Sequence, residues 1–199
     1  MGVEIEAKMR LASREQMISR LQEAGAKPVA ELSETNSYFD TADGELKSTD
    51  QGLRTRIEVV NAGSPNERVV TTITHKGPRA HGVLKSRDES ELVVDNARDA
   101  AELLGALGYH HVLTFEKRRT RYELDACRVE LDELPVLGSF IEIEGPSEAE
   151  VLAVREKLAM SNTPVIKSSY IAMLKTHLQE THNESVVMKF QDGKSVLKD

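Results

Sequence analysis

The sequence predicts an α+β domain built on a mostly antiparallel β-barrel with helices on its flanks. Two observations lead to this prediction. Many segments alternate between polar and apolar residues, which is the pattern of a strand with two different faces. Turn residues separate most of these segments at distances typical of hairpins. The 199 residues are enough for one domain, and we find no internal repeat and no linker.

The first half of the chain contributes most of the expected strands. Residues 3–11 alternate, and a helix follows because Ser13 and Gln16 form a capping box and Gly25 can end the helix. A turn cluster at 61–66 joins two strands into a hairpin. The further strands expected here cover 29–40, a short stretch near Leu46, 53–60, 68–76 and 83–94.

The second half is predicted to alternate between helices and strands. A helix over 96–107 ends at Gly108, and three strands follow over 112–124, 127–134 and 139–144. Ser147 and Glu150 form a second capping box, which opens a helix to about residue 158, and a last helix covers 168–178. Beyond Glu180 the chain is polar with little periodicity, so residues 180–199 are predicted to be a poorly ordered tail.

Several strands carry charged residues of one sign at positions i and i+2. These sets are Glu4/Glu6, Arg54/Arg56, Glu89/Glu91, Lys117/Arg119/Arg121, Glu130/Asp132 and Glu142/Glu144. One such row alone would be a solvated face, but solvent faces usually mix signs because neighbouring like charges repel. Rows sorted by sign therefore predict that the charged faces point into a shared lumen. Cations and an anion would balance them there, and the apolar faces would lie outside, beneath the helices.

Composition restricts the class of ligand. The net charge of −7 argues against nucleic-acid binding, so a local basic cluster or metal ions must hold any anionic ligand. We expect no membrane span and no signal peptide, and the lone Cys127 fits a reducing cytoplasm. P-loop, dinucleotide-binding and zinc motifs are missing. Acid rows suit Mg²⁺ and basic rows suit phosphate, which together favour phosphoryl-type chemistry.

One motif near the N-terminus resembles a known family. Glu4-Ile5-Glu6-Ala7-Lys8 resembles the Glu-x-Glu-x-Lys signature of the CYTH superfamily, the triphosphate tunnel metalloenzymes. Further matching segments are Tyr38-Phe39-Asp40-Thr41, Leu53-Arg54-Thr55-Arg56, Lys76-Gly77-Pro78, Arg87-x-Glu89-x-Glu91, Glu116-Lys117-x-Arg119, Leu131-Asp132, Gly138 to Glu144 and Lys167-Ser168-Ser169-Tyr170. The series covers roughly residues 1–178. It implies a CYTH domain over 1–179 with an eight-stranded closed barrel that forms a tunnel.

The resemblance also implies roles for individual residues. The metal-binding carboxylates would be Glu4, Glu6, Glu142 and Glu144, holding two Mg²⁺ or Mn²⁺ ions when substrate is bound. The triphosphate clamp would consist of Lys8, Arg54, Arg56, Lys76, Lys117, Arg119 and Lys167. The residues expected to take part in catalysis are Glu4, Glu6, Lys76, Lys117, Asp132 and Glu142, whereas Glu89 and Glu91 resemble tunnel acids of unassigned role. Arg87, Arg121 and Glu130 face the same way and could equally form plain ion pairs, and Tyr38 and Tyr170 are expected to be structural.

The resemblance is strongest to the class IV adenylyl cyclases, which convert ATP to cyclic AMP and pyrophosphate. It rests on the segment from Leu107-Gly108-Tyr109 through Phe115-Glu116-Lys117 to Glu142, and on Lys76-Gly77-Pro78. A triphosphatase acting on inorganic, thiamine or nucleoside triphosphate remains the alternative, and a non-catalytic polyphosphate-binding module is a third. No adenine pocket is recognisable in the sequence. The expected partner is a small triphosphate in the cytoplasm, with neither nucleic acid nor membrane, and the family makes a homodimer possible.

Overall fold

The computed structural model describes residues 2–79, 85–191 and 194–198, with side chains from Ile5 to Arg79 and from Arg87 to Phe190. The first eight strands are β1 (Gly2–Arg10), β2 (Lys27–Asp40), β3 (Gly52–Val60), β4 (Arg68–Lys76), β5 (Lys85–Val94), β6 (His110–Leu124), β7 (Cys127–Leu134) and β8 (Gly138–Glu144). The helices are α1 (Arg14–Glu23), α2 (Glu45–Ser48), α3 (Ala97–Ala106), α4 (Glu148–Lys157) and α5 (Tyr170–Glu180). A hairpin of β9 (Val187–Gln191) and β10 (Lys194–Lys198) ends the chain.

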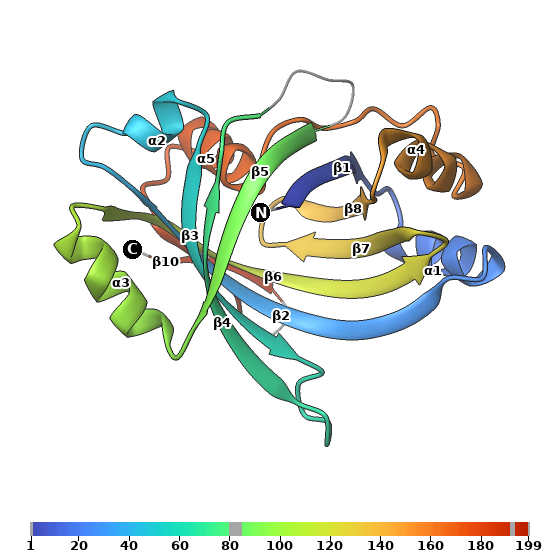
Figure 1. Cartoon of the computed structure of the whole chain (residues 1–199), viewed down its shortest axis with the longest axis horizontal. Helices are drawn as coiled ribbons and strands as arrows, with labels where there is room; N and C mark the ends of the chain where they lie inside the picture. Colours follow the sequence, from blue (N-terminus) through green and yellow to red (C-terminus); the bar gives the residue numbers. More distant parts are fainter. Residues whose placement is uncertain (1, 80–84, 192–193, 199) are drawn as a thin grey trace.

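The eight strands form a closed antiparallel ring, as the sequence predicted. Their order is β6-β2-β3-β4-β5-β1-β8-β7, and β7 pairs back onto β6 to close the ring (Figure 1). β6 pairs with β2 along one edge, while its other edge pairs with β7 only from Arg118 onward. The preceding part of that second edge, at Thr114 and Phe115, pairs in parallel with β9.

The largest hydrophobic core lies outside the barrel, between its wall and two helices. Apolar residues of β1, β7 and β8 alternate with the charged ones and pack against α1 and α4. Its fully buried members include Met9, Leu131 and Ile141 on the strands, with Leu21 and Val151 on the helices. The same alternation that places charges in the lumen therefore places the core beneath the helices, as predicted.

A second core fills one end of the lumen, which the sequence did not predict. Phe115 shares the lumen face of β6 with Lys117, and Phe140 shares that of β8 with Glu142, because residues two apart on a strand point the same way. Both rings are buried and pack with Tyr170 of α5. The lumen is therefore apolar at the α5 end and charged along the rest of its length.

The predicted helix caps are present. The Ser13 hydroxyl accepts a hydrogen bond from the Gln16 backbone N–H, and the Ser147 hydroxyl accepts one from that of Glu150. The Ser147 hydroxyl also donates to the Glu150 carboxylate at 2.8 Å, which satisfies two polar groups at the start of α4. The capping signals therefore located the starts of α1 and α4 correctly.

The short strand predicted near Leu46 is wrong, because this stretch is the helical turn α2. The Asp40 carboxylate accepts hydrogen bonds from the backbone N–H groups of Leu46 and Lys47, at 2.9 and 3.1 Å. Gly44 precedes the turn with a φ of 75°, a left-handed conformation that glycine adopts without strain. Asp40 thus stabilises the start of α2 from six residues upstream, and the stretch forms a helical turn instead of a strand.

The end of the chain also differs from the poorly ordered tail predicted over 180–199. β9 pairs with β6, and Met188 of β9 is fully buried beside Leu174 of α5. The backbone N–H of Phe190 donates to the Glu116 carboxylate at 2.8 Å, and the Arg118 guanidinium stacks over the Phe190 ring. The described part of this segment is therefore held to β6 and α5.

In the portion of the chain that the structure describes, every helix is too short or too polar to cross a membrane.

The burial of Met188 gives a test of this C-terminal packing. We expect Met188→Ala to lower the free energy of unfolding by about 2–5 kcal/mol, because it leaves a cavity in a packed core. The exposed Val186 provides the control, since Val186→Ala removes apolar atoms from the same segment without opening the core. Urea unfolding monitored by circular dichroism measures both losses. Equal, small losses in the two variants would show that β9 does not contribute to the folded core.

Candidate active site

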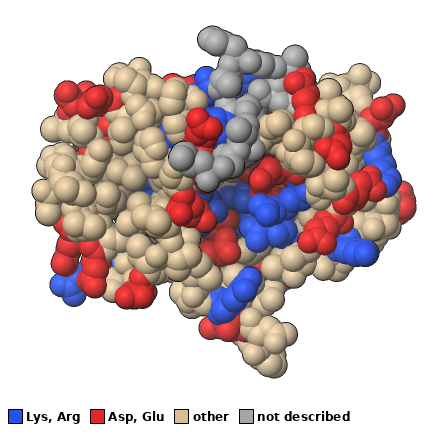
Figure 2. All heavy atoms as spheres, in the orientation of Figure 1, with Lys and Arg blue, Asp and Glu red and all other residues tan. Residues whose placement is uncertain are grey.

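A cavity of about 720 Å³ occupies the charged part of the lumen, and residues of all eight barrel strands line it. Figure 2 shows Lys and Arg side chains gathered at the hollow in this face, with acidic side chains around it. The predicted site residues that line the cavity are Glu6, Lys8, Arg54, Arg56, Lys76, Glu89, Glu91, Lys117, Arg119, Glu142 and Glu144. The inward direction of the charged faces is therefore correct for each of these residues.

Two predicted site residues are placed differently, and the side chain of a third is not among those that the structure describes. Asp132 is fully buried on the same face of β7 as Glu130, in contact with Arg119, and is outside the set of residues that line the cavity. Lys167 is exposed, and its position is outside the set of residues that line the cavity. The backbone of Glu4 belongs to β1, opposite Arg87 of β5, but its side chain is outside the described residues.

Arg119 connects the acids of this wall. Its guanidinium binds Asp132 through two nitrogens, at 2.6 and 2.7 Å, and reaches Glu142 at 2.5 Å. It also pairs with Glu130 of β7 and lies 3.6 Å from Glu34 of β2. Burial opposes the charged form of Arg119, but these acids outweigh it and raise its pKa well above the ordinary value. Arg119 therefore stays protonated and links four strands.

Tyr170 brings helix α5 into this network. Its hydroxyl donates to Asp132 at 2.9 Å, and Lys8 Nζ lies 4.1 Å from the centre of its ring. Burial and the negative charge of Asp132 raise the pKa of Tyr170 well above its usual value, so the phenol remains a proton donor. The expectation that Tyr170 is structural fits these contacts. Its neighbours Ser168 and Ser169 line the cavity, which the sequence did not indicate.

Glu34 of β2 is the main residue that sequence reasoning missed. Its side chain is fully buried, and its carboxylate lies 3.0 Å from Arg56 and 3.2 Å from Lys117. Asn36, two residues on, accepts a hydrogen bond from Arg56 at 2.8 Å and donates one to Glu34 at 3.3 Å. The sequence did carry one signal: Glu34 and Asn36 lie four and two residues before Tyr38 on the predicted strand, so all three side chains share one face. An acid followed by an amide makes no like-signed row.

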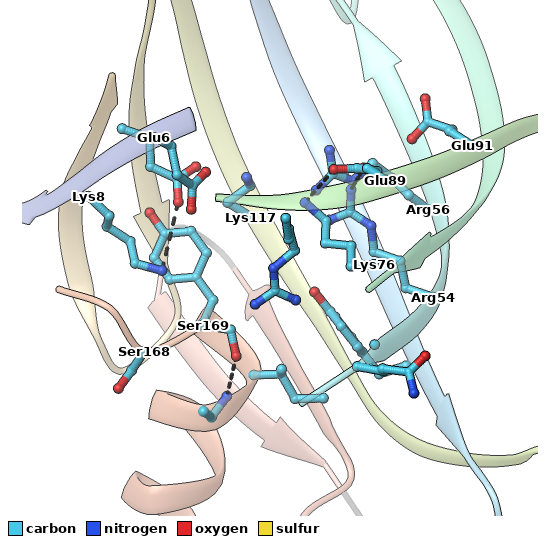
Figure 3. A pocket seen from close by; sticks show the side chains of 18 of the residues that line it. Glu6, Lys8, Arg54, Arg56, Lys76, Glu89, Glu91, Lys117, Ser168 and Ser169 are labelled. Atoms are coloured by element: carbon cyan, nitrogen blue, oxygen red, sulfur yellow. Dashed lines mark hydrogen bonds and ion pairs between the residues drawn. The ribbon is translucent and has the colours of Figure 1, made fainter. Parts of the chain in front are cut away.

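A third group of charges lies on β3, β4 and β5. Glu89 approaches Lys76 at 2.8 Å and Arg54 at 3.8 Å (Figure 3). Glu91 instead accepts a hydrogen bond from the Thr74 hydroxyl at 2.9 Å. These contacts place Arg54 and Lys76 on the same acid, which joins three neighbouring strands.

Of the three residues left open between tunnel and ion-pair roles, Arg121 and Glu130 combine both. Arg121 lines the cavity and pairs with Glu130 at 2.8 Å. Arg87 also lines the cavity, and its buried Nε has no hydrogen-bond partner within the described part of the protein.

The carboxylates predicted to bind metal come from the paired strands β1 and β8. Glu6 is opposite Glu144, and Lys8 is opposite Glu142. Glu142 lies 3.8 Å from Lys8, and Glu144 lies 3.2 Å from Arg128. Within the described residues, no three acidic, His or Cys side chains are grouped closely enough to hold one ion together. As a donor set, these hard carboxylate oxygens match what Mg²⁺ and Mn²⁺ prefer.

The environment of Glu34 predicts an acid-dependent loss of stability. Burial alone would raise its pKa, but Arg56, Lys117, Arg119 and Arg54 outweigh it and hold the pKa well below 4.5. Stabilisation from a depressed pKa is fully present above the unfolded value and is lost as the pH falls through the folded value. We expect Glu34→Gln to cost about 3–5 kcal/mol at pH 7, because it leaves buried cations uncompensated. The difference from wild type should shrink as the pH falls below 4.5.

Denaturant unfolding from pH 7 to pH 3 measures this difference. Glu31→Gln is the control, because Glu31 lies on the same strand but is exposed. A constant difference between Glu34→Gln and wild type across this pH range would contradict the assignment of Glu34 as a buried, ionised partner.

Comparison with known proteins agrees with this geometry. The CYTH domain family matches residues 2–171. A protein of Methanocaldococcus jannaschii, provisionally named an adenylate cyclase, is 23% identical over 180 residues, which span 86% of this chain and 98% of that protein. The adenylate cyclase CyaB of Aeromonas hydrophila is 32% identical over 120 residues, which span 60% of this chain and 56% of CyaB.

Solved structures share the fold. The protein PH1819 of Pyrococcus horikoshii superimposes with a TM-score of 0.73 and 26% identity, covering 87% of this chain and 99% of its own. HpAC1 of Hippeastrum, described as having a dominant triphosphatase activity, superimposes with a TM-score of 0.66 and 22% identity. The match covers 87% of this chain and 96% of HpAC1. The family match spans most of the sequence and includes every barrel strand. This chain therefore belongs to the CYTH domain family.

Proposed function

We propose that this protein binds a triphosphate in the charged lumen and converts ATP to cyclic AMP and pyrophosphate. CYTH proteins process triphosphates, and both curated relatives carry the name adenylate cyclase. The observation that carries the proposal is the arrangement of charge across the cavity. β3, with Arg54 and Arg56, lies four strands from β8 in the ring of eight, so these cations face the carboxylates of β8 across the lumen.

The cations would bind the phosphate chain. Lys8, Lys76 and Lys117 line the same cavity as the two arginines of β3 (Figure 3). Because the whole chain carries a net charge of −7, this local concentration of positive charge is what can attract a polyanion. Arginine can bind phosphate oxygens through two nitrogens and lysine acts as a point charge, so a chain of several phosphates would satisfy all five.

The acids of β1 and β8 suit a divalent cation. Glu6, Glu142 and Glu144 would hold it, and when bound it would supply positive charge at the phosphate and lower the pKa of a coordinated hydroxyl. In the cyclase reaction, the ribose 3′ oxygen would lose its proton and bond to the α-phosphorus. The bond from that phosphorus to the β-phosphate oxygen would break, and the cations of the clamp would stabilise the charge on departing pyrophosphate.

Hydrolysis of the triphosphate is the second candidate, because HpAC1, with the same fold, is described as having a dominant triphosphatase activity. In this reaction water would replace the ribose oxygen, and orthophosphate would be released. The same clamp serves both reactions, so the position of the phosphate chain relative to the attacking oxygen decides between them.

Arg56 tests the clamp. We expect Arg56→Ala to weaken binding of tripolyphosphate by about 10–100-fold, because charge-assisted hydrogen bonds contribute about 1.5–3 kcal/mol. Binding of orthophosphate should change much less, since a single phosphate reaches fewer of the cations. Arg118→Ala is the control, because Arg118 lies on β6 but outside the cavity lining and loses the same charge. Isothermal titration calorimetry measures both ligands, and equal losses for both would contradict a polyphosphate clamp.

One assay distinguishes the two reactions. The protein is incubated with ATP, and separately with tripolyphosphate, in Mg²⁺ or Mn²⁺, and ³¹P NMR and chromatography identify the products. Cyclic AMP with pyrophosphate is the expected result. Orthophosphate would support hydrolysis instead, and binding without turnover would leave only a binding module. Glu6→Gln should abolish turnover while keeping the fold, because it removes one carboxylate from a crowded acid row.

A further inference from the structure

The side chain of Glu89 lies on two of the cations that the proposed function assigns to phosphate. Its carboxylate is 2.8 Å from Lys76 Nζ and 3.8 Å from the Arg54 guanidinium (Figure 3). All three residues line the cavity, and they come from neighbouring strands. A carboxylate in this position occupies the place where an oxygen of a bound phosphate would interact with the same two cations.

Among the described acids that pair with clamp cations, Glu89 has the side chain with the greatest access to solvent. Glu34 and Asp132 have fully buried side chains, and Glu130 and Glu142 expose 4% and 11%. The Glu89 side chain exposes 21%. An acid with more access to water loses less on leaving its partner, because water replaces part of the interaction. Of the described ion pairs with clamp cations, those of Glu89 are therefore the easiest to exchange.

The pairing also leaves Arg54 incompletely satisfied. Its separation of 3.8 Å from Glu89 exceeds hydrogen-bond length, and its buried Nε has no hydrogen-bond partner among the described residues. A buried donor without a partner favours any ligand that can supply an acceptor. Phosphate groups carry several strong acceptor oxygens, whereas the single carboxylate of Glu89 is already held by Lys76.

We propose that Glu89 is an internal anion that occupies the Arg54–Lys76 pair until a polyphosphate displaces it. This inference rests on the proposed function, because it assigns a role to an acid inside the same clamp. In the protein without ligand, Glu89 prevents small anions from binding to Arg54 and Lys76. A ligand that displaces Glu89 must contact further cations of the lumen to offset the loss of the Glu89 ion pairs. Glu89 thereby favours polyphosphates over single anions such as orthophosphate or chloride.

The matched pair of Glu89→Gln and Glu91→Gln tests the proposal. Both substitutions remove one negative charge from the same face of β5, but Glu91 contacts the Thr74 hydroxyl instead of the two cations. Tripolyphosphate is titrated calorimetrically into the full chain, in EDTA and separately in Mg²⁺. In EDTA, Glu89→Gln should bind about two- to fivefold more tightly than wild type, which is the value of one partly exposed ion pair. Glu91→Gln should show a clearly smaller gain.

The possible outcomes separate the two levels of the proposal. If wild type binds and Glu89→Gln binds equally or more weakly in EDTA, the displacement role is overturned and the proposed function stands. Equal gains in Glu89→Gln and Glu91→Gln would also overturn it, because net charge alone would explain them. If wild type binds tripolyphosphate in neither EDTA nor Mg²⁺, the proposed function itself fails. Glu89→Asp, which keeps the charge but shortens the reach to Lys76, should also tighten binding and serves if Glu89→Gln does not fold.

Discussion

The pairing of buried charges inside a closed ring of strands is the constraint on which this structure depends. Removing an ion from water is costly, so a lumen crowded with acids and bases is stable only if each meets an opposite charge. Arg119 meets this condition for Glu34, Asp132 and Glu142, which lie on three other strands. A shift of any of these strands by one residue would turn its charges into the outer core, so the network also enforces the register of the barrel.

The two ends of the lumen follow from the same constraint. Near α5 the strands place aromatic residues inward, and Tyr170 joins this apolar end to the charged part through Asp132. The packed aromatic residues lower the local polarity, which strengthens the interactions among the charges beside them. The cations of β3 and β4 lie beyond that region, where the cavity has room for a ligand. The charged cavity therefore has one apolar end, at the position where α5 packs against the barrel.

Much of this arrangement can be predicted from the sequence because strand alternation is a local signal. The rows at Arg54 and Arg56 and at Lys117 and Arg119 repeat with period two, and their shared sign indicates a common lumen. Features that depend on distant partners are not visible in this way. Glu34 belongs to no such row, and its role comes from cations on β3 and β6.

The short elements show the same limit. The turn α2 forms because Asp40 caps it, although its sequence is compatible with a strand. The strand β9 forms because β7 leaves part of the β6 edge unpaired, and a polar tail then finds a partner there. Neither partner is adjacent in sequence, and neither can be read from the pattern of the segment itself.

The closed ring has a consequence for how such proteins diversify. Backbone hydrogen bonds between neighbouring strands hold the wall together, and they do not involve the side chains that face inward. Inward positions can thus be exchanged, provided that charges remain matched, without opening a strand edge. New substrate preferences can then arise through a few replacements on an unchanged scaffold, so shared architecture among relatives says little about which molecule each one transforms.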